Sequence, residues 1–451
     1  MAASGVFLGL AAAGLFYLRP AGFAMLMIGA VALTGVVLVR LLGVRTGLMV
    51  LIIAACIVDQ WVFPLGPVNI RPEQIAVLIA LGFFLWDRSP SRDASWLRPN
   101  ASELILLGWF VVNLVSSVLE APSKTASLKI LGLLGVSSIA LFLPRRMLAV
   151  DRRLFGEVLR WLLLAIAFEA GYVLATYFLH LFGPTIALGI NPATHRLEPL
   201  GTLWEPNVVG AICGAGAIAW IHLGPRYARY PWIGVALCIA ACVASFSRAA
   251  WFAVLVVLFL TLATPVRRRV DLRAFGFGAL MATLLSVLVF VADEPGNYSS
   301  GAGVVSSVGN STDIVGRLYQ IRPVLEDLHS PLRLIIGAGT DSFGQRHLNQ
   351  GAPQHLANLE LTLLNDTGLL GLLLFGAFGA ALMVAAWRHR ESANVVGVGA
   401  MLLVLAISNT ATETLELMIT WLLLGLLLAA IQNAGQVSEP ASAHTAPGTV
   451  T

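Results

Sequence analysis

Long apolar segments alternate with short polar ones along most of the chain. A helix that crosses a bilayer needs about 20 mainly apolar residues, because the hydrocarbon core is about 30 Å thick and each residue rises about 1.5 Å. On this rule the sequence predicts about 14 membrane spans, or about 12 if short neighbouring pairs form re-entrant hairpins. The predicted spans are residues 5–18, 22–40, 46–63, 73–86, 101–119, 126–144, 154–182, 207–223, 232–247, 249–265, 274–292, 359–386, 396–411 and 414–431. The pattern therefore predicts an all-α fold, a polytopic bundle of membrane-spanning helices.

Composition supports this class and excludes others. The 451 residues are 58% hydrophobic and 12% charged, and the mean hydropathy is +0.84, which soluble globular domains do not reach. The formal net charge is only +4 and no basic domain stands apart, so no nucleic-acid partner is expected. Cys238 and Cys242 share a helix face, but no His or carboxylate accompanies them, so we expect no metal site.

Arginine placement predicts the orientation, because basic residues near the ends of spans are retained on the cytoplasmic side. One set of alternate loops holds most of them: Arg40, Arg45, Arg88, Arg92, Arg98, Arg145, Arg146, Arg152, Arg153, Arg226, Arg229, Arg267, Arg268, Arg269, Arg273, Arg388 and Arg390. This puts both termini inside and divides the chain into N-terminal spans (1–292), an outer loop (293–358), C-terminal membrane helices (359–432) and a disordered cytoplasmic tail (433–451). The predicted location is an inner membrane, crossed many times.

The outer loop has two halves of different character. Residues 295–312 are rich in Gly and Ser, which is typical of a mobile linker. Residues 313–335 have an apolar helical period that predicts an amphipathic helix along the outer membrane surface. The apolar positions are Ile314, Leu318, Ile321, Leu325 and Leu328.

A few arginines work against the orientation rule and are candidates for binding an anion. They are Arg196, Arg248, Arg317, Arg322, Arg333 and Arg346. Arg248 lies between two apolar segments, where a guanidinium is costly and either functional or paired with a carboxylate. Arg196 precedes a helix that begins near Asn207, whose first amides can face an anion. Several guanidinium groups together suit a diphosphate, because each offers a planar fork of donors to phosphate oxygens.

Histidine is the other scarce residue at the outer side. His347 and His355 lie near the end of the outer loop. A neutral imidazole beside cationic groups can accept a proton from a sugar hydroxyl, although a solvated loop histidine is the alternative. The glycines of IIGAGTDSFG (residues 335–344) suggest tight turns more than a nucleotide-binding loop, because no strand precedes them. Glu413 and Glu416 share a helix face and are interpreted as counter-ions to arginines or as proton-coupling groups.

Four segments resemble the bacterial O-antigen ligase and polymerase superfamily, membrane transferases that act on polyprenyl-diphosphate-linked glycans. They are RLEPLGTLWEPNVVG (196–210), SFSRAAWFAVLVV (245–257), GRLYQIRPVLEDLHSPLRLIIGAGTDSFG (316–344) and HLANLELTLLNDTGLLG (355–371). In the fourth, Asn358 occupies the family's expected position before G-x-x-G, whereas Ala357 stands where the family has histidine. His355 lies two residues earlier.

The resemblance implies a bundle whose outer cavity holds the lipid diphosphate, and inverting glycan transfer without metal or cofactor. It implies that Arg196, Arg248, Arg317 and Arg322 hold the diphosphate and stabilise the leaving group. His355, or else His347, would activate the acceptor hydroxyl. Asn207 and Asn358 are further possible contacts. The partners would be the lipid-linked glycan, a lipid or glycan acceptor and membrane lipids, and the protein is expected to be a monomer.

Three functions remain open from the sequence. A ligase would move the glycan from undecaprenyl diphosphate to another acceptor on the outer, periplasmic face, as in lipopolysaccharide biosynthesis. A polymerase of the same superfamily would extend the polysaccharide with itself as acceptor. A flippase or exporter would use intramembrane carboxylates as coupling groups, namely Asp59, Glu169, Glu413 and Glu416. Polar residues concentrate at the outer boundary, which favours an enzyme.

Overall fold

The computed structural model describes residues 20–58, 63–65, 68–86, 99–148, 152–183, 188–190, 197–203, 205–263, 276, 278–284, 312–347, 356, 358–410, 414–415 and 417–438. Its helices are α2 (Pro20–Leu42), α3 (Val44–Ile57), α4 (Pro72–Trp86), α5 (Ala101–Leu119), α6 (Lys124–Leu148), α7 (Arg152–His180), α8 (Pro206–Tyr227), α9 (Pro231–Ala244), α10 (Arg248–Ala263), α13 (Thr312–Asp327), α14 (Pro331–Ile336), α15 (Ser342–His347), α16 (Leu359–Arg388), α17 (Ala393–Ser408) and α18 (Met418–Ser438). Two antiparallel hairpins join β1 (Phe63–Leu65) to β2 (Val68–Ile70) and β3 (Leu188–Ile190) to β4 (Leu197–Pro199).

The predicted all-α membrane bundle is confirmed. Six of the described helices are long and apolar enough to cross a membrane, and six shorter ones are apolar. They fall on twelve of the predicted spans; the span predicted at 5–18 and most of that at 274–292 lie outside the described residues. The span predicted at 46–63 is wrong at its end. Helix α3 stops at Ile57, and the chain then enters the β1–β2 hairpin, where Pro64 cannot donate a helical hydrogen bond.

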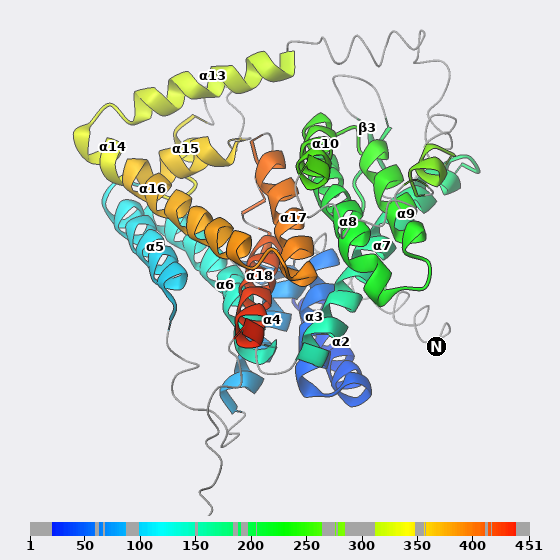
Figure 1. The fold of residues 1–451 in the computed structure, drawn as a ribbon. Helices are drawn as coiled ribbons and strands as arrows, with labels where there is room; N and C mark the ends of the chain where they lie inside the picture. The colour runs from blue at the N-terminus through cyan, green and yellow to red at the C-terminus, as the bar shows by residue number, and fades with distance from the viewer. Residues whose placement is uncertain are drawn as a thin grey trace, which may run out of the picture.

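Helix α8 is the innermost of the long helices (Figure 1). It packs against α7, α9, α10 and α17. Its small residues permit close approach: a Cβ on Gly216 would lie 2.3 Å from Ile166 Cγ2, and one on Gly210 would lie 2.4 Å from Ser245 Oγ. Small residues at helix contacts are the usual means by which membrane helices gain packing energy. Helices α5, α6, α16 and α18 form the other side of the bundle, and α17 joins the two sides through α8 and α18.

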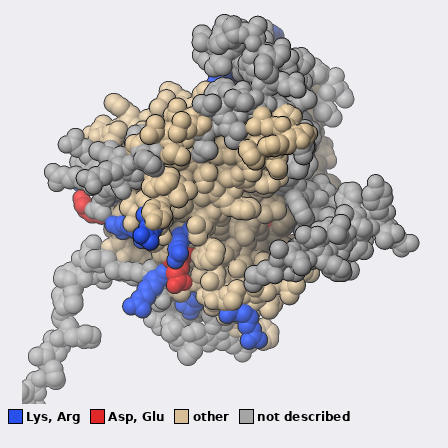
Figure 2. All heavy atoms as spheres, turned by 90° about the vertical axis from the view of Figure 1, so that its right-hand side faces the viewer, with Lys and Arg blue, Asp and Glu red and all other residues tan. Residues whose placement is uncertain are grey.

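The bundle has two chemically different ends. Helices α13, α14 and α15 lie across one of them, which we call the loop end (Figure 1). The opposite, basic end carries Arg145 and Arg146, which both pair with Glu103, a side chain only 1% exposed. Glu103 also completes a capping box with Asn100 at the start of α5. On the face shown in Figure 2, Lys and Arg atoms gather in the lower part, with a broad uncharged region above them.

The amphipathic helix predicted at 313–335 is divided in two. Helix α13 ends at Asp327, and α14 begins after Ser330, whose hydroxyl accepts a hydrogen bond from the Arg333 amide while Pro331 occupies the first turn. Val324 and Leu328 are buried in the protein, whereas Ile321 and Leu325, on the predicted apolar face, are exposed. The placement of this face along the outer membrane surface stays a prediction.

Helix α16 is broken at Gly368, whose φ of 63° and ψ of −166° interrupt the helical hydrogen bonds. The loop at 337–341 fills the break: the amides of Ala338 and Gly339 donate to the carbonyl oxygens of Asn365 and Asp366, at 2.7 and 3.2 Å. A Cβ on Gly337 would lie 2.3 Å from the Asp366 backbone, so this approach requires glycine. The glycines of residues 335–344 thus serve backbone turns and close packing.

We expect Gly368→Ala to destabilise the protein. Its Cβ would lie 2.5 Å from the Ile335 carbonyl group, in a backbone conformation that side chains rarely adopt, which costs at least about 1–3 kcal/mol. Gly376→Ala on the same helix is the control, since its Cβ would have no neighbour within 4 Å. Thermal unfolding in detergent should show a lower melting temperature for Gly368→Ala alone. Equal melting temperatures would contradict the assigned role of the break.

Candidate functional site

A cavity of about 260 Å³ opens at the loop end, beside the break in α16. Its walls come from the starts of α4 and α6, the middle of α5, the loop at 337–341 and the first turns of α16. Trp109, Ile130, Leu134 and Leu363 form much of its apolar lining. Polar groups from several helices therefore meet in one apolar recess, which is the usual form of a small-molecule site.

Two cationic residues line one side of the cavity. Arg71 lies immediately before α4 and is half-buried, with its amide donating to Gln74 Oε1 at 3.1 Å. Lys129 lies on the part of α6 nearest the loop end and is exposed at the cavity. Both belong to the N-terminal part of the chain.

Two carboxylates, Asp341 and Asp366, line the cavity from the other direction. Asp366 Oδ2 accepts the Asp341 amide at 2.9 Å, and Asp366 Oδ1 accepts Asn365 Nδ2 at 2.9 Å. The Asp366 carbonyl oxygen also accepts Ser116 Oγ from α5 at 2.7 Å. These bonds fix the carboxylate at the helix break, 7% exposed.

The loop at 337–341 is also tied to α5 by side chains. Thr340 Oγ1 donates to Asn113 Oδ1 at 3.1 Å, and the Thr340 amide donates to Ser117 Oγ at 3.1 Å. Thr340 and Asn113 both line the cavity. The polar residues of α5 therefore hold the loop in place.

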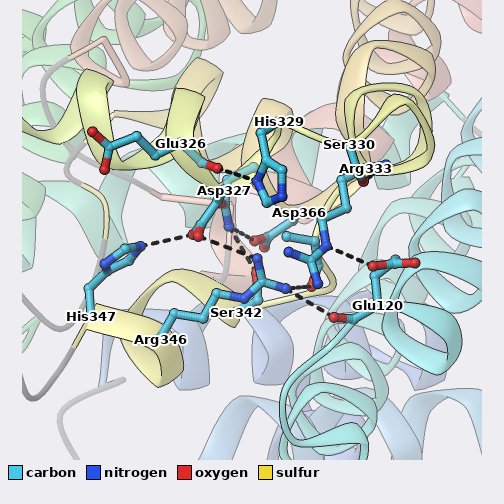
Figure 3. A network of polar contacts seen from close by, with 12 residues as sticks. Glu120, Glu326, Asp327, His329, Ser330, Arg333, Ser342, Arg346, His347 and Asp366 are labelled. Atoms are coloured by element: carbon cyan, nitrogen blue, oxygen red, sulfur yellow. Dashed lines mark hydrogen bonds and ion pairs between the residues drawn. The ribbon is translucent and has the colours of Figure 1, made fainter.

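Helix α13 covers the edge of the cavity. Val324 and Leu328 pack with Phe343 and Leu356, and these last two also line the cavity. The cover is attached by the polar network in Figure 3: Arg346 lies between Asp327, at 3.4 Å, and the Glu120 carbonyl oxygen, at 3.0 Å. We call the residues Glu120, Asp327, Arg333, Arg346 and His347 the cover network.

His347 belongs to the cover network and not to the cavity lining. Its Nε2 lies 2.9 Å from Asp327 Oδ2, and its ring packs against Phe343 at a tilt of 42°, with centroids 4.8 Å apart. Arg333 Nε donates to Glu120 Oε2 at 2.7 Å and so joins α14 to the end of α5.

None of the other predicted site residues whose side chains are described lines the cavity. His355 and Arg196 lie outside the described residues, and Arg317 lies on α13 with its side chain outside them. Arg322 forms an exposed pair with Glu326 at 2.7 Å, and Arg248 begins α10, so neither lines the cavity. Asn207 donates to Glu205 at 3.2 Å.

Asn358 caps α16. Its Oδ1 accepts the Leu361 amide at 2.9 Å, and its Nδ2 donates to the Thr410 carbonyl oxygen at 2.9 Å. The side chain thereby joins the start of α16 to the end of α17.

Glu169, one of the candidate coupling carboxylates, is fully buried in α7. Both of its oxygens accept hydrogen bonds from Thr202, one from the amide at 2.9 Å and one from the hydroxyl at 2.6 Å. It therefore anchors the loop that leads into α8. Asp59, Glu413 and Glu416 lie outside the described residues. Within the described part of the chain, no three His, Cys, Asp or Glu side chains are placed to hold a metal ion.

Sequence reasoning missed Arg71, Lys129 and Asp366. Arg71 falls on the outer side in the predicted topology, so the orientation rule itself marks it as unusual. Lys129 stands within a predicted apolar span, in a chain with only two lysines. Asp366 lies two residues before Gly368, within the span predicted at 359–386. Its contacts come from a loop 25 residues earlier, which no local pattern indicates.

We expect Arg346→Ala to loosen the segment 313–347. The substitution removes a charged hydrogen bond to Glu120 and leaves Asp327 without its guanidinium, and such bonds contribute about 1.5–3 kcal/mol. Chymotrypsin should therefore cleave within this segment about tenfold faster, as followed by mass spectrometry. Arg322→Ala is the control, because its ion pair is exposed and worth little. Equal cleavage rates in the two variants would show that the cover is held by other contacts.

Comparison with known proteins agrees with the resemblance in the sequence. The O-antigen ligase family model matches residues 233–376, about a third of the chain. The match spans most of α9, all of α10, helices α13, α14 and α15, the loop at 337–341 and the broken part of α16. No curated protein matches the chain. Over residues 233–376 the chain is thus similar to the O-antigen ligase family, and its helical membrane bundle agrees with that similarity.

Proposed function

We propose that the protein is a glycosyltransferase that moves a glycan from a polyprenyl diphosphate, such as undecaprenyl diphosphate, to an acceptor hydroxyl. The observation that carries this proposal is the cavity at the loop end, since eight of its eighteen described lining residues lie in the segment that matches the O-antigen ligase family. The basic end lies in the cytoplasm by the arginine rule, so the cavity faces the periplasm of a bacterial inner membrane.

The reaction is an inverting displacement. The acceptor oxygen attacks the anomeric carbon, the bond from that carbon to the phosphate oxygen breaks, and polyprenyl diphosphate leaves. Arg317, with Arg196, stabilises the negative charge on the leaving diphosphate, and His355 takes the proton from the acceptor hydroxyl. These roles follow from the family resemblance, and Arg248, Arg322 and His347 are the alternatives in them. The charge stabilisation needs no metal ion because guanidinium groups supply it.

We prefer a ligase to a polymerase of the same superfamily, although both enzymes would bind the lipid-linked donor in the same way. The acceptor, a lipid or a growing glycan, separates the two. Products that lengthen without any added lipid acceptor would identify the polymerase.

A flippase or exporter is less well supported. It needs carboxylates that are able to change their protonation with transport. Both oxygens of Glu169 are engaged by Thr202, an arrangement that supports a structural role for this carboxylate.

The proposal is tested with detergent-purified protein, a polyprenyl-diphosphate glycan and a chelator throughout. We expect wild type to form product without any ion gradient, and Arg317→Ala and His355→Ala to lose at least about a hundredfold in rate. Arg390→Ala, at the basic end, is the control and should retain full activity.

The outcomes separate the parts of the proposal. Full activity in Arg317→Ala would refute the assigned leaving-group role. Loss in Arg317→Ala but not in His355→Ala would move the base to another residue, with His347 next. Absence of turnover with ligase and polymerase acceptors alike would favour transport.

A further inference from the structure

The charges of the cavity are divided between its two walls. Arg71 and Lys129 line it from the N-terminal helices α4 and α6, outside the segment that matches the family. Asp341 and Asp366 line it from within that segment. A site with cations on one side and carboxylates on the other suits a sugar phosphate, whose phosphate is anionic and whose hydroxyls donate hydrogen bonds.

Lysine is rare in this chain, so a lysine that lines the cavity is a candidate ligand-binding residue. Of the 28 basic residues only Lys124 and Lys129 are lysines, and both lie on α6. Lys124 is exposed at the first residue of the helix and does not line the cavity, whereas Lys129 does. A cation that lies within a predicted span and lines a cavity is costly unless it serves a ligand or a counter-ion.

We propose that Lys129 and Arg71 bind the diphosphate of the lipid-linked donor, while Asp341 and Asp366 face the hydroxyls of its first sugar. This rests on the proposed glycan transfer and adds residues from the N-terminal helices to it. Arg71 offers a planar fork to the phosphate oxygens, and Lys129 adds a compact charge from the neighbouring helix α6. Together they offset charge on the diphosphate as it leaves.

The size of the cavity fits this assignment. At about 260 Å³ it is smaller than a site for a drug-sized molecule. It therefore accommodates a diphosphate with its neighbouring sugar and leaves the polyprenyl chain and the remaining glycan outside. Helix α13 covers the edge of this compartment through Phe343 and Leu356.

Two lysines on one helix allow a direct test in the wild-type protein. An amine-reactive reagent modifies both exposed ammonium groups, and mass spectrometry counts each modification separately. Inorganic diphosphate and undecaprenyl diphosphate should each slow modification of Lys129 at least about fivefold and leave Lys124 unchanged. Equal modification of Lys129 with and without these probes would overturn the proposal.

Further probes identify the source of the phosphate. Inorganic phosphate and phosphatidylglycerol micelles test for a general anion site and a lipid-headgroup site. Protection by phosphatidylglycerol equal to that by undecaprenyl diphosphate would overturn the donor assignment, because the site would then bind any phospholipid. Protection that requires the diphosphate supports it.

Variants connect the site to transfer. Lys129→Ala and Arg71→Ala should weaken binding of undecaprenyl diphosphate at least about tenfold and raise KM for the donor. Lys129→Arg should recover most of the affinity, and Lys124→Ala should match wild type. If transfer proceeds normally in Lys129→Ala and Arg71→Ala, the present inference fails while the proposed function stands. If Lys129 is protected but no variant or wild type transfers glycan, the anion site stands and the proposed function fails.

Discussion

The break in α16 is the constraint on which the loop end depends. Inside a bilayer each backbone amide and carbonyl needs a partner within the protein, so an interrupted membrane helix is stable only where other groups complete its hydrogen bonds. Here the amides of Ala338 and Gly339 and the hydroxyl of Ser116 serve the carbonyl oxygens exposed by Gly368. The loop at 337–341 is thereby fixed within the bundle, and the carboxylates of Asp341 and Asp366 are fixed with it.

Two parts of the chain that are distant in sequence therefore form the walls of the cavity. The broken helix and its loop supply a rigid carboxylate wall, while α4, α5 and α6 supply Arg71, Trp109 and Lys129. The polar residues of α5 form the connection, because Asn113 and Ser117 bind Thr340 directly. A change in the packing of α5 would therefore alter both walls at once.

The sequence predicted the helical spans well because apolar length is a strong signal, and α5 matches its predicted bounds fully. It also indicated the glycine turns of residues 335–344. It did not reveal the break at Gly368, since glycine in an apolar span is common and the partners of the break are distant in the chain. The burial of Val324 in α13 was not predicted for a related reason: it packs with Phe343 and Leu356, a contact made in three dimensions only. Arg71 and Lys129 were missed because they lie outside the four segments that carry the resemblance, and only the fold brings them to the same cavity.

The two attachments at the loop end differ in strength. The loop at 337–341 is held by buried hydrogen bonds to Asn113 and Ser117 and by a part-buried one to Asp366. Helix α13 is held by the small apolar cluster around Val324 and by the partly exposed ion pairs of the cover network. Segments with fewer buried contacts open at lower free energy. Movement of α13 would therefore expose the cavity while the wall that carries Asp366 stays in place, as access for the proposed lipid-linked donor requires.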